Sequence, residues 1–368
     1  MIRRARGIQL AAAAAIALAG CGGAGSSSGA GGHLAQATAY LPGTPGSSYS
    51  FEFADWNAIE RQLGIKPSQL RSARAAAPLY RIDQRTAVPG GNVPYDLAPP
   101  GKARLWSAPD VAWDATEIPT TSSPPLTMTG FQPSFDLSSV GRTLAGCGFT
   151  SKKVDGASLY SASLQAVAKC AGPFGDRIPT ATNFALDAAN HTVLMSGSPT
   201  VITAALSAKD ANQAAPGLTS LLAQLNGDQA IAAGVGPGFC SRLSNPLLFV
   251  GRLATPAALA RAEKLYPPAR PYAALGFGIT VTRSAARGHV VFAYPDANAA
   301  RADLADREHR LRTGTSITGE LPYSRLVRFL SGRTADSSVV LDVAAPAGRP
   351  LELGRMFDTQ DLGLARCG

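Results

Sequence analysis

Short apolar runs bounded by turn residues recur along the chain and predict β-strands, and apolar and polar residues alternate in the first of them, residues 48–53. The clearest runs cover residues 48–53, 183–186, 191–195, 230–235, 273–281, 289–293, 326–330 and 339–343. Two pairs of runs, within 183–195 and within 273–293, are separated by only a few residues, so each pair is expected to form a hairpin. The strands of a hairpin are antiparallel, so the pattern predicts a mainly antiparallel sheet.

Helical periodicity follows several of these strands, each time behind a capping residue. Asp55 precedes apolar residues at positions 56, 59 and 63, and Gly64 ends that segment. Asp136, Ser198 and Asp296 begin comparable segments. Asp and Ser are favoured at these positions because their side-chain oxygens accept hydrogen bonds from the amides of the first helical turn. We therefore expect an amphipathic helix after each of the four residues.

The segment that follows Asp296 is the longest of these helices and runs to about residue 312 before Gly314. Its apolar positions predict a face packed on the core, and its charged positions predict a face in water. The residues expected to face the core are Ala300, Leu304 and Leu311. The residues expected to face water are Asp303, Asp306, Arg307 and Arg310.

Strands and helices are mixed without the strict alternation of a parallel sheet, which favours the α+β class. Gly, Pro, Ser and Asn concentrate between residues 236 and 245, and each side holds a helix, a hairpin and another helix. This pattern is compatible with split ferredoxin-like packing. We expect two α+β subdomains, 37–240 and 241–368, each a mixed, mainly antiparallel sheet with helices on one face. Residues 87–125 are rich in Pro, Gly, Ser and Thr and are expected to be irregular.

The amino-terminal residues have the three parts of an export signal: a basic start, an apolar stretch over residues 7–19, and small residues before a cleavage point. The apolar stretch is too short to span a bilayer, which takes about 20 apolar residues. Leu18, Ala19, Gly20 and Cys21 resemble the lipobox of bacterial lipoproteins at all four positions. The resemblance implies a signal peptide over residues 1–20 and a diacylglycerol on the Cys21 sulfur.

Lipidation at Cys21 predicts where the protein resides. Two or more acyl chains, including a palmitate, hold a protein on a membrane for long periods. Residues 22–32 are almost all Gly, Ser and Ala, so we expect residues 21–36 to be a flexible tether. We thus expect an exported protein anchored by lipid to the outer face of the cell membrane, or to another envelope membrane.

Charge and composition limit the classes of binding partner that the protein is expected to have. Removing residues 1–20, which hold three Arg and no acid, lowers the formal net charge from +9 to +6. The basic residues are dispersed, without the clustered basic and aromatic patch of a nucleic-acid binder, so we expect no nucleic-acid partner. No second apolar run reaches 18 residues, which leaves the lipid as the expected membrane anchor.

The five cysteines divide into one and four. Lipid is expected to occupy Cys21, which leaves Cys147, Cys170, Cys240 and Cys367, an even number in an oxidising compartment. We favour bonds between Cys147 and Cys170 and between Cys240 and Cys367, although three pairings are possible. A metal site is the alternative, but the chain holds no C-x-x-C and no His near any of the four.

No catalytic or cofactor motif emerges. The four His are scattered, and the sequence holds no P-loop. The matches to G-x-S-x-G at residues 25–29 and to G-x-G-x-x-G at residues 20–25 lie in the Gly- and Ser-rich stretch around Cys21, without the strand and helix that a nucleophile elbow or a dinucleotide site needs. Trp106 and Trp113 lie beside Asp110 and Asp114, and such mixtures can line sugar or peptide grooves. The two Trp are therefore candidate binding residues, and the alternative is that they pin a long loop. We expect no catalytic residue, metal or cofactor.

The sequence thus predicts a lipid-anchored envelope protein whose body binds another envelope protein or a small ligand without catalysing a reaction. One alternative is a solute-capturing lipoprotein for a transporter, which needs a deep cleft between two lobes. A second alternative is an exported hydrolase with a non-local active site. A Ser or a carboxylate within hydrogen-bond reach of His191 or His289 would favour the hydrolase.

Overall fold

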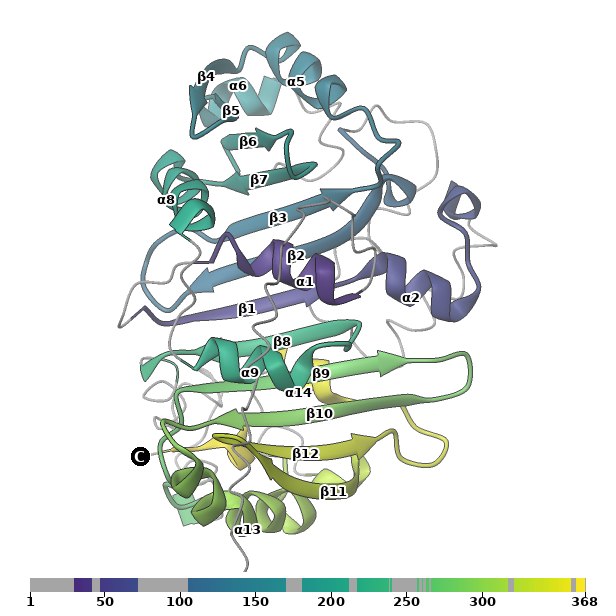
Figure 1. Ribbon diagram of the computed structural model, residues 1–368, viewed down its shortest axis with the longest axis vertical. Coiled ribbons are helices and arrows are strands. Elements are labelled where there is room, and N and C mark those ends of the chain that lie inside the picture. Colours follow the sequence, from purple (N-terminus) through teal and green to yellow (C-terminus); the bar gives the residue numbers. More distant parts are fainter. Residues whose placement is uncertain are drawn as a thin grey trace, which may run out of the picture.

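The chain folds around one antiparallel sheet of 12 described strands (Figure 1). The computed structural model describes residues 30–41, 47–71, 105–169, 181–211, 217–237, 239, 257, 260, 263–264, 266–316, 321–358 and 362–367. The strand order is β11-β12-β10-β9-β8-β1-β2-β3-β7-β6-β5-β4, and each neighbouring pair is antiparallel. The α+β class and the mainly antiparallel sheet are therefore confirmed.

The strands are short, and most of them match the runs that the sequence predicts as strands. Their bounds are β1 Tyr49–Ala54, β2 Val111–Pro119, β3 Leu126–Phe131, β4 Thr150–Val154, β5 Ala157–Ser161, β6 Asn183–Asp187, β7 Thr192–Ser196, β8 Ala230–Val235, β9 Ala274–Val281, β10 Ala286–Ala293, β11 Arg328–Ala335 and β12 Ser338–Ala344. The expected hairpins are present as β6 with β7 and β9 with β10.

Helices cover both faces of the sheet, so the expectation of helices on one face is wrong. One face carries α1 Ala30–Thr38, α8 Pro199–Ala211 and α9 Leu218–Leu225. The other face carries α2 Trp56–Leu63, α5 Leu137–Gly146, α6 Leu164–Lys169, α13 Ala297–Thr313 and α14 Leu353–Asp358. The physical reason is that strands such as β8 are buried along their whole length, and a strand buried on both sides needs cover on both sides.

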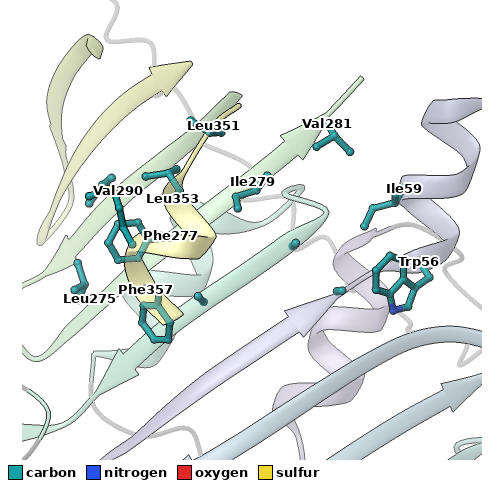
Figure 2. Close-up of a cluster of buried hydrophobic side chains, with 14 of the residues drawn as sticks. Trp56, Ile59, Leu275, Phe277, Ile279, Val281, Val290, Leu351, Leu353 and Phe357 are labelled. Carbon is teal, nitrogen blue, oxygen red and sulfur yellow. The ribbon is translucent and has the colours of Figure 1, made fainter. Parts of the chain in front are cut away.

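Alternation along the strands divides the buried side chains into two cores. Leu275, Phe277 and Ile279 of β9 belong to the core beneath α2, α13 and α14, whereas Ala274 belongs to the core beneath α9. Figure 2 shows the β9 side chains directed toward α14, where Phe277 meets Phe357 edge to face at 5.9 Å. Large side chains of β9 thus fill the core on one face of the sheet. Small residues on its other face leave room for α9 to pack closely.

Three of the four predicted helix caps, Asp55, Asp136 and Asp296, are confirmed. The side chain of Asp55 accepts a hydrogen bond from the amide of Ala58, and Asp136 and Asp296 cap α5 and α13 in the same manner. Gly64 ends α2 in the left-handed conformation, with φ of 70°, which glycine adopts without strain. These ends could be read from sequence because a cap depends on local residues.

The connectivity of the sheet repeats on the two sides of the central β1–β8 pair. On one side β1, β2 and β3 lie in sequence, followed by α5 and by β7 as the next strand in space. On the other side β8, β9 and β10 lie in sequence, followed by α13 and by β12. β1 and β2 flank α2 in sequence and are adjacent in the sheet, so the split arrangement of a ferredoxin-like unit is not formed there.

Two further expectations need correction. Residues 30–36, expected to be flexible tether, belong to α1, because Leu34 and Ala37 are buried against the sheet. Residues 111–119, expected to be irregular, form β2, one of the central strands. The sheet is continuous across the boundary expected near residue 240, since β8 pairs with both β1 and β9, and the division into subdomains stays a prediction.

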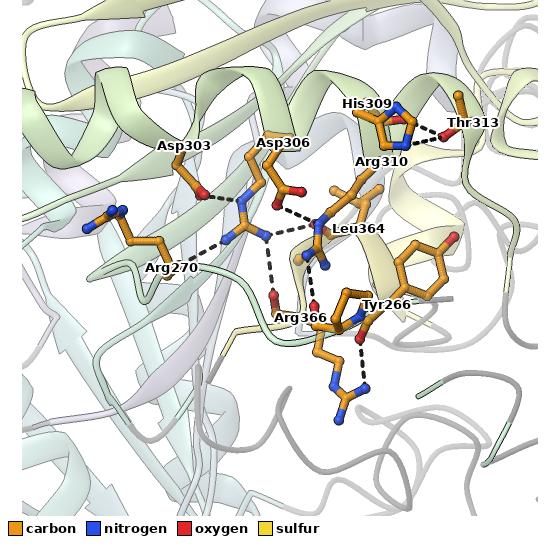
Figure 3. A network of polar contacts seen from close by, with 12 residues as sticks. Tyr266, Arg270, Asp303, Asp306, His309, Arg310, Thr313, Leu364 and Arg366 are labelled. Atoms are coloured by element: carbon orange, nitrogen blue, oxygen red, sulfur yellow. Dashed lines mark hydrogen bonds and ion pairs between the residues drawn. The ribbon is translucent and has the colours of Figure 1, made fainter. Parts of the chain in front are cut away.

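The expected exposure of the charged residues of α13 also needs correction, because part of that face is buried. Arg307 is fully buried; its guanidinium contacts Asp303 and donates to the backbone oxygens of Leu364, Arg366 and Arg270 at 2.9 to 3.3 Å (Figure 3). Asp303 and Arg310 are also buried, whereas Asp306 is exposed as expected. Carbonyl oxygens of the carboxyl-terminal segment supply the partners that make burial of the cation tolerable.

The structure records Cys147 and Cys367 as disulfide-bonded, although no bond joins two of the described cysteines. Cys170 and Cys240 lie outside the described residues, as does Cys21. Cys147 caps the end of α5, and Cys367 is fully buried near Ala269, with which it forms an isolated parallel bridge. The favoured pairing therefore stays a prediction.

Candidate functional site

The two Trp proposed as binding residues do not share a groove. Trp113 lies on β2, is 1% exposed and packs in the core beneath α1, so it cannot contact a ligand without opening that core. Trp106 packs against the core on the opposite face of the sheet, edge to face with Phe131 at 5.2 Å. Trp113 therefore serves packing, which corrects the binding hypothesis for that residue. Trp106 is half-buried, and its role as a binding residue stays a prediction.

The four His lie at separate places. His33 is on α1 and contacts the Asp55 carboxylate at 3.0 Å. His191 lies in the β6–β7 turn with φ of 52°, and His309 lies on α13 beside Thr313. Only His289, on β10, lies among several polar side chains from different strands. These side chains form the first candidate site.

We call this group the His289 cluster; its members come from four adjacent strands and one loop. They are Asp228, Thr280, His289, Ser331, Arg333 and Asp342. His289 lies directly opposite Gly278 of β9 and Asp342 of β12, and Asp342 lies opposite Ser331 of β11. Residues directly opposite in antiparallel strands project from the same face of the sheet. Pairing of the strands therefore brings these side chains together.

The imidazole of His289 lies between two carboxylates. Its Nδ1 is 2.8 Å from Oδ1 of Asp342, and its Nε2 is 3.8 Å from Oδ1 of Asp228. Gly278 makes room for Asp228, because a Cβ at that position would lie 1.8 Å from the Asp228 carboxylate. A side chain at position 278 would therefore displace one of the two acids.

The pKa values of the two carboxyl groups are shifted in opposite directions. Burial raises the pKa of Asp228 to about 6, and the nearby His289 only partly offsets this effect. Burial also acts to raise the pKa of Asp342, but hydrogen bonds from Ser331, Arg333 and His289 outweigh it and hold that pKa below its ordinary value. Asp342 is thus a stable carboxylate, and Asp228 is an acid that titrates at mildly acidic pH.

The His289 cluster provides a possible proton acceptor but no activated nucleophile. A hydrolase of the Ser-His-Asp type needs a hydroxyl bonded to the imidazole. In the described part of the chain, the hydroxyl of Ser331 donates to Asp342 at 2.7 Å and that of Thr280 donates to Asp228 at 2.9 Å. Both hydroxyls therefore support the carboxylates, and neither is oriented by His289.

A second candidate site lies two residues further along the same strands, on the same face of the sheet. Arg287 of β10 and Arg328 of β11 both lie opposite Ala344 of β12, one on each side of it. Ala344 is small, so the two long side chains flank a hollow. The loop that follows β12 adds Arg349 after a turn at Gly348, where φ is 66°. A cleft of about 590 Å³, bounded also by the β9–β10 hairpin, holds all three arginines. We call it the arginine cleft.

Within the described part of the chain, no acid neutralises the positive charge of the arginine cleft. All three arginines are exposed, and none of their guanidinium groups has a hydrogen-bond or ion-pair partner among the described residues. Glu352, close to the cleft in sequence, instead contacts Arg355 at 3.6 Å. Guanidinium groups recognise carboxylate and phosphate oxygens through paired hydrogen bonds. The arrangement is therefore suited to an anionic ligand.

Sequence reasoning named His289 as a residue to check but missed its partners and the arginine cleft, because these residues are far apart in the chain. Asp228, His289 and Asp342 share no motif and meet only through strand pairing. The arginines carried no signal either, since they are dispersed in sequence. The available clue was the pair of strand-like runs at 289–293 and 339–343, but only the register shows which residues face one another.

The described residues include no helix long and apolar enough to cross a membrane. Within the same residues, no group of three or more His, Cys, Asp or Glu side chains is arranged to hold a metal ion.

Comparison with known proteins gives little further information. No protein family matches the sequence, and no curated protein matches it. Two solved structures, crystal forms I and III of TP0453, match with TM-scores of 0.37 and 0.35 and sequence identities of 11% and 10%. Form I covers 89% of this chain and 96% of its own, and form III covers 88% and 97%. The similarity is too low to support a conclusion about function.

Proposed function

We propose that the chain is an exported lipoprotein, anchored through Cys21, whose folded body is a non-catalytic module that binds an anionic ligand in the arginine cleft. The resemblance of residues 18–21 to a lipobox supports the anchor. The observation that carries the binding function is the set of three arginines, from β10, β11 and the loop after β12, around one cleft without an acidic partner in the described chain.

Two finer features belong to the same proposal. The cysteines pair as Cys147 with Cys170 and Cys240 with Cys367, as expected for an exported protein. The disulfide-bonded state of Cys147 and Cys367 supports oxidised cysteines, and the choice between Cys170 and Cys240 as the partner of each rests on the sequence alone. The two α+β subdomains, residues 37–240 and 241–368, are the second feature, and the repeated strand order on the two sides of the β1–β8 pair supports a two-part organisation.

The hydrolase alternative has one observation in its favour, the contact between His289 and Asp342 at 2.8 Å. We disfavour it because both nearby hydroxyls bond to carboxylates. The transporter-capture alternative calls for two lobes around a deep cleft, and the continuous pairing of β1 with β8 along Tyr49–Ala54 argues for a fixed sheet there.

The anchor is tested by metabolic labelling with a palmitate analogue. We expect the wild-type chain to carry the label in the membrane fraction and Cys21→Ser to carry none, since the Cys21 thiolate is the proposed acyl-glyceryl acceptor. Label retained on Cys21→Ser would refute the assignment. A wild-type chain that stays unlabelled would refute it equally.

The binding half is tested on the chain from residue 21 onward with Cys21→Ser, which removes no described residue. Calorimetric titration with inorganic phosphate and with citrate is expected to show binding that Arg287→Gln/Arg328→Gln/Arg349→Gln abolishes. The matched control removes three positive charges elsewhere, by Arg142→Gln/Lys152→Gln/Lys153→Gln on α5 and β4. Equal binding by both triple variants would contradict the proposed site.

A further inference from the structure

The arginine cleft and the start of α1 lie at the same end of the sheet. A chain of contacts connects them: His33 of α1 contacts Asp55 at 3.0 Å, and the Asp55 amide donates to the backbone oxygen of Gln229 at 2.7 Å. The side chain of Gln229 then accepts from the amide of Val281 at 2.9 Å, and Val281 lines the cleft. Figure 1 shows the β9–β10 hairpin and the end of β12 projecting on the same side as α2.

The proposed anchor lies a short distance along the chain from that end. Residues 22–29 separate Cys21 from Ala30, where α1 begins. Since an extended chain spans at most about 3.5 Å per residue, the start of α1 stays within roughly 30 Å of the lipid-bearing sulfur. That reach is comparable with the thickness of a bilayer core, so the end of the sheet with the arginine cleft is held close to the membrane.

Exposed charge at this end is mainly positive. Besides the three cleft arginines, Arg283 in the β9–β10 turn is exposed, and its Nε donates to the backbone oxygen of Leu63 at 3.0 Å. The acids at this end are sequestered: Asp55 and Glu60 are buried, and Asp342 is paired with Arg333 at 2.8 Å. An anionic bilayer attracts such a surface and presents many phosphates to it.

We propose that the arginine cleft binds the phosphate groups of anionic phospholipids in the membrane that holds the anchor. This inference rests on the proposed function and names its ligand. Each guanidinium group offers two parallel donors to phosphate oxygens, and Arg287 and Arg328 stand one strand away from Ala344 on either side. Binding orients the folded body with the end of β9, β10 and β12 against the bilayer, whereas β4 lies at the opposite edge of the sheet from β11.

The test uses flotation of the unacylated chain, from residue 21 with Cys21→Ser, with phosphatidylcholine vesicles with and without phosphatidylglycerol. The lipid anchor is absent, so any binding comes from the folded body. We expect binding only to the vesicles that contain phosphatidylglycerol, weakened by added salt. Arg287→Gln/Arg328→Gln/Arg349→Gln is expected to weaken it about a hundredfold, at about fivefold for each residue.

The control Arg142→Gln/Lys152→Gln/Lys153→Gln has the same net charge and is expected to bind near the wild-type level. Equal loss in both triple variants would overturn the proposal, because binding would then follow net charge. Binding of inorganic phosphate or citrate in the cleft, without binding to phosphatidylglycerol vesicles, would overturn the lipid assignment and leave the proposed function standing. Circular dichroism and thermal unfolding confirm that the variants fold, as expected for exposed side chains.

Discussion

At the scale of single residues, partners decide what each charged group can do. Arg142 contacts Asp136 at 2.8 Å and Arg310 contacts Asp306 at 2.6 Å, so these charges are used within the chain. The arginines of the cleft lack such contacts among the described residues and can meet an external anion. Composition could not separate the two kinds of arginine, because pairing depends on which strands are neighbours.

Glu60 shows the opposite case, an acid buried without a partner. It is 1% exposed, both carboxyl oxygens lack a hydrogen bond, and burial, followed by the nearby Asp55, raises its pKa from 4.5 to about 8. Burial similarly raises the pKa of Glu117 to about 7. An acid with a raised folded-state pKa holds its proton more tightly when folded, so stability is greatest at low pH and falls as pH rises toward that pKa.

We predict that Glu60→Gln makes the protein more stable than wild type above pH 8, by roughly 1 to 3 kcal/mol, and changes little at pH 5. The expected reason is that Gln avoids ionisation of a buried group. Urea unfolding at both pH values measures the difference, and Glu263→Gln, at an exposed position, serves as the control. A gain of the same size at pH 5 and pH 9 would show that ionisation is not the cause.

At the scale of elements, the sequence predicted what depends on neighbouring residues and missed what depends on distant ones. Short apolar runs in the sequence predicted most strands, and Asp55 and Asp296 marked the starts of two helices. The prediction of which α13 residues face water was wrong in part. The helical pattern could not reveal that the carboxyl-terminal segment supplies carbonyl oxygens to Arg307. β2 was missed because proline and serine flank it in sequence.

Arg307 connects α13 to the carboxyl-terminal segment, and we predict that Arg307→Met destabilises the fold by about 3 to 5 kcal/mol. The loss follows because Asp303 and three backbone oxygens lose their buried donor. Arg301→Met, at an exposed position of the same helix, is expected to change stability by less than about 0.5 kcal/mol. Chemical denaturation measures both variants, and similar values for the two would contradict the assigned role of Arg307.

At the scale of the whole molecule, the α+β class could be predicted, but the single sheet could not. The pairing of β1 with β8 joins segments more than 170 residues apart, and no local pattern specifies it. The same is true of the candidate site, because Arg287, Arg328 and Arg349 meet only after β10, β11 and β12 are in register. The proposed lipid anchor and the cleft together imply one orientation of the molecule on a membrane.

Hydrogen exchange of the acylated protein tests that orientation most directly, by comparing phosphatidylglycerol-containing vesicles with detergent micelles. We predict slower exchange on vesicles in the β9–β10 turn, residues 281–286, and in the loop over residues 345–351, because both border the arginine cleft. The distant hairpin of β4 and β5 is expected to exchange equally in both settings. Slower exchange confined to β4 and β5, or no difference at the cleft, would contradict the account.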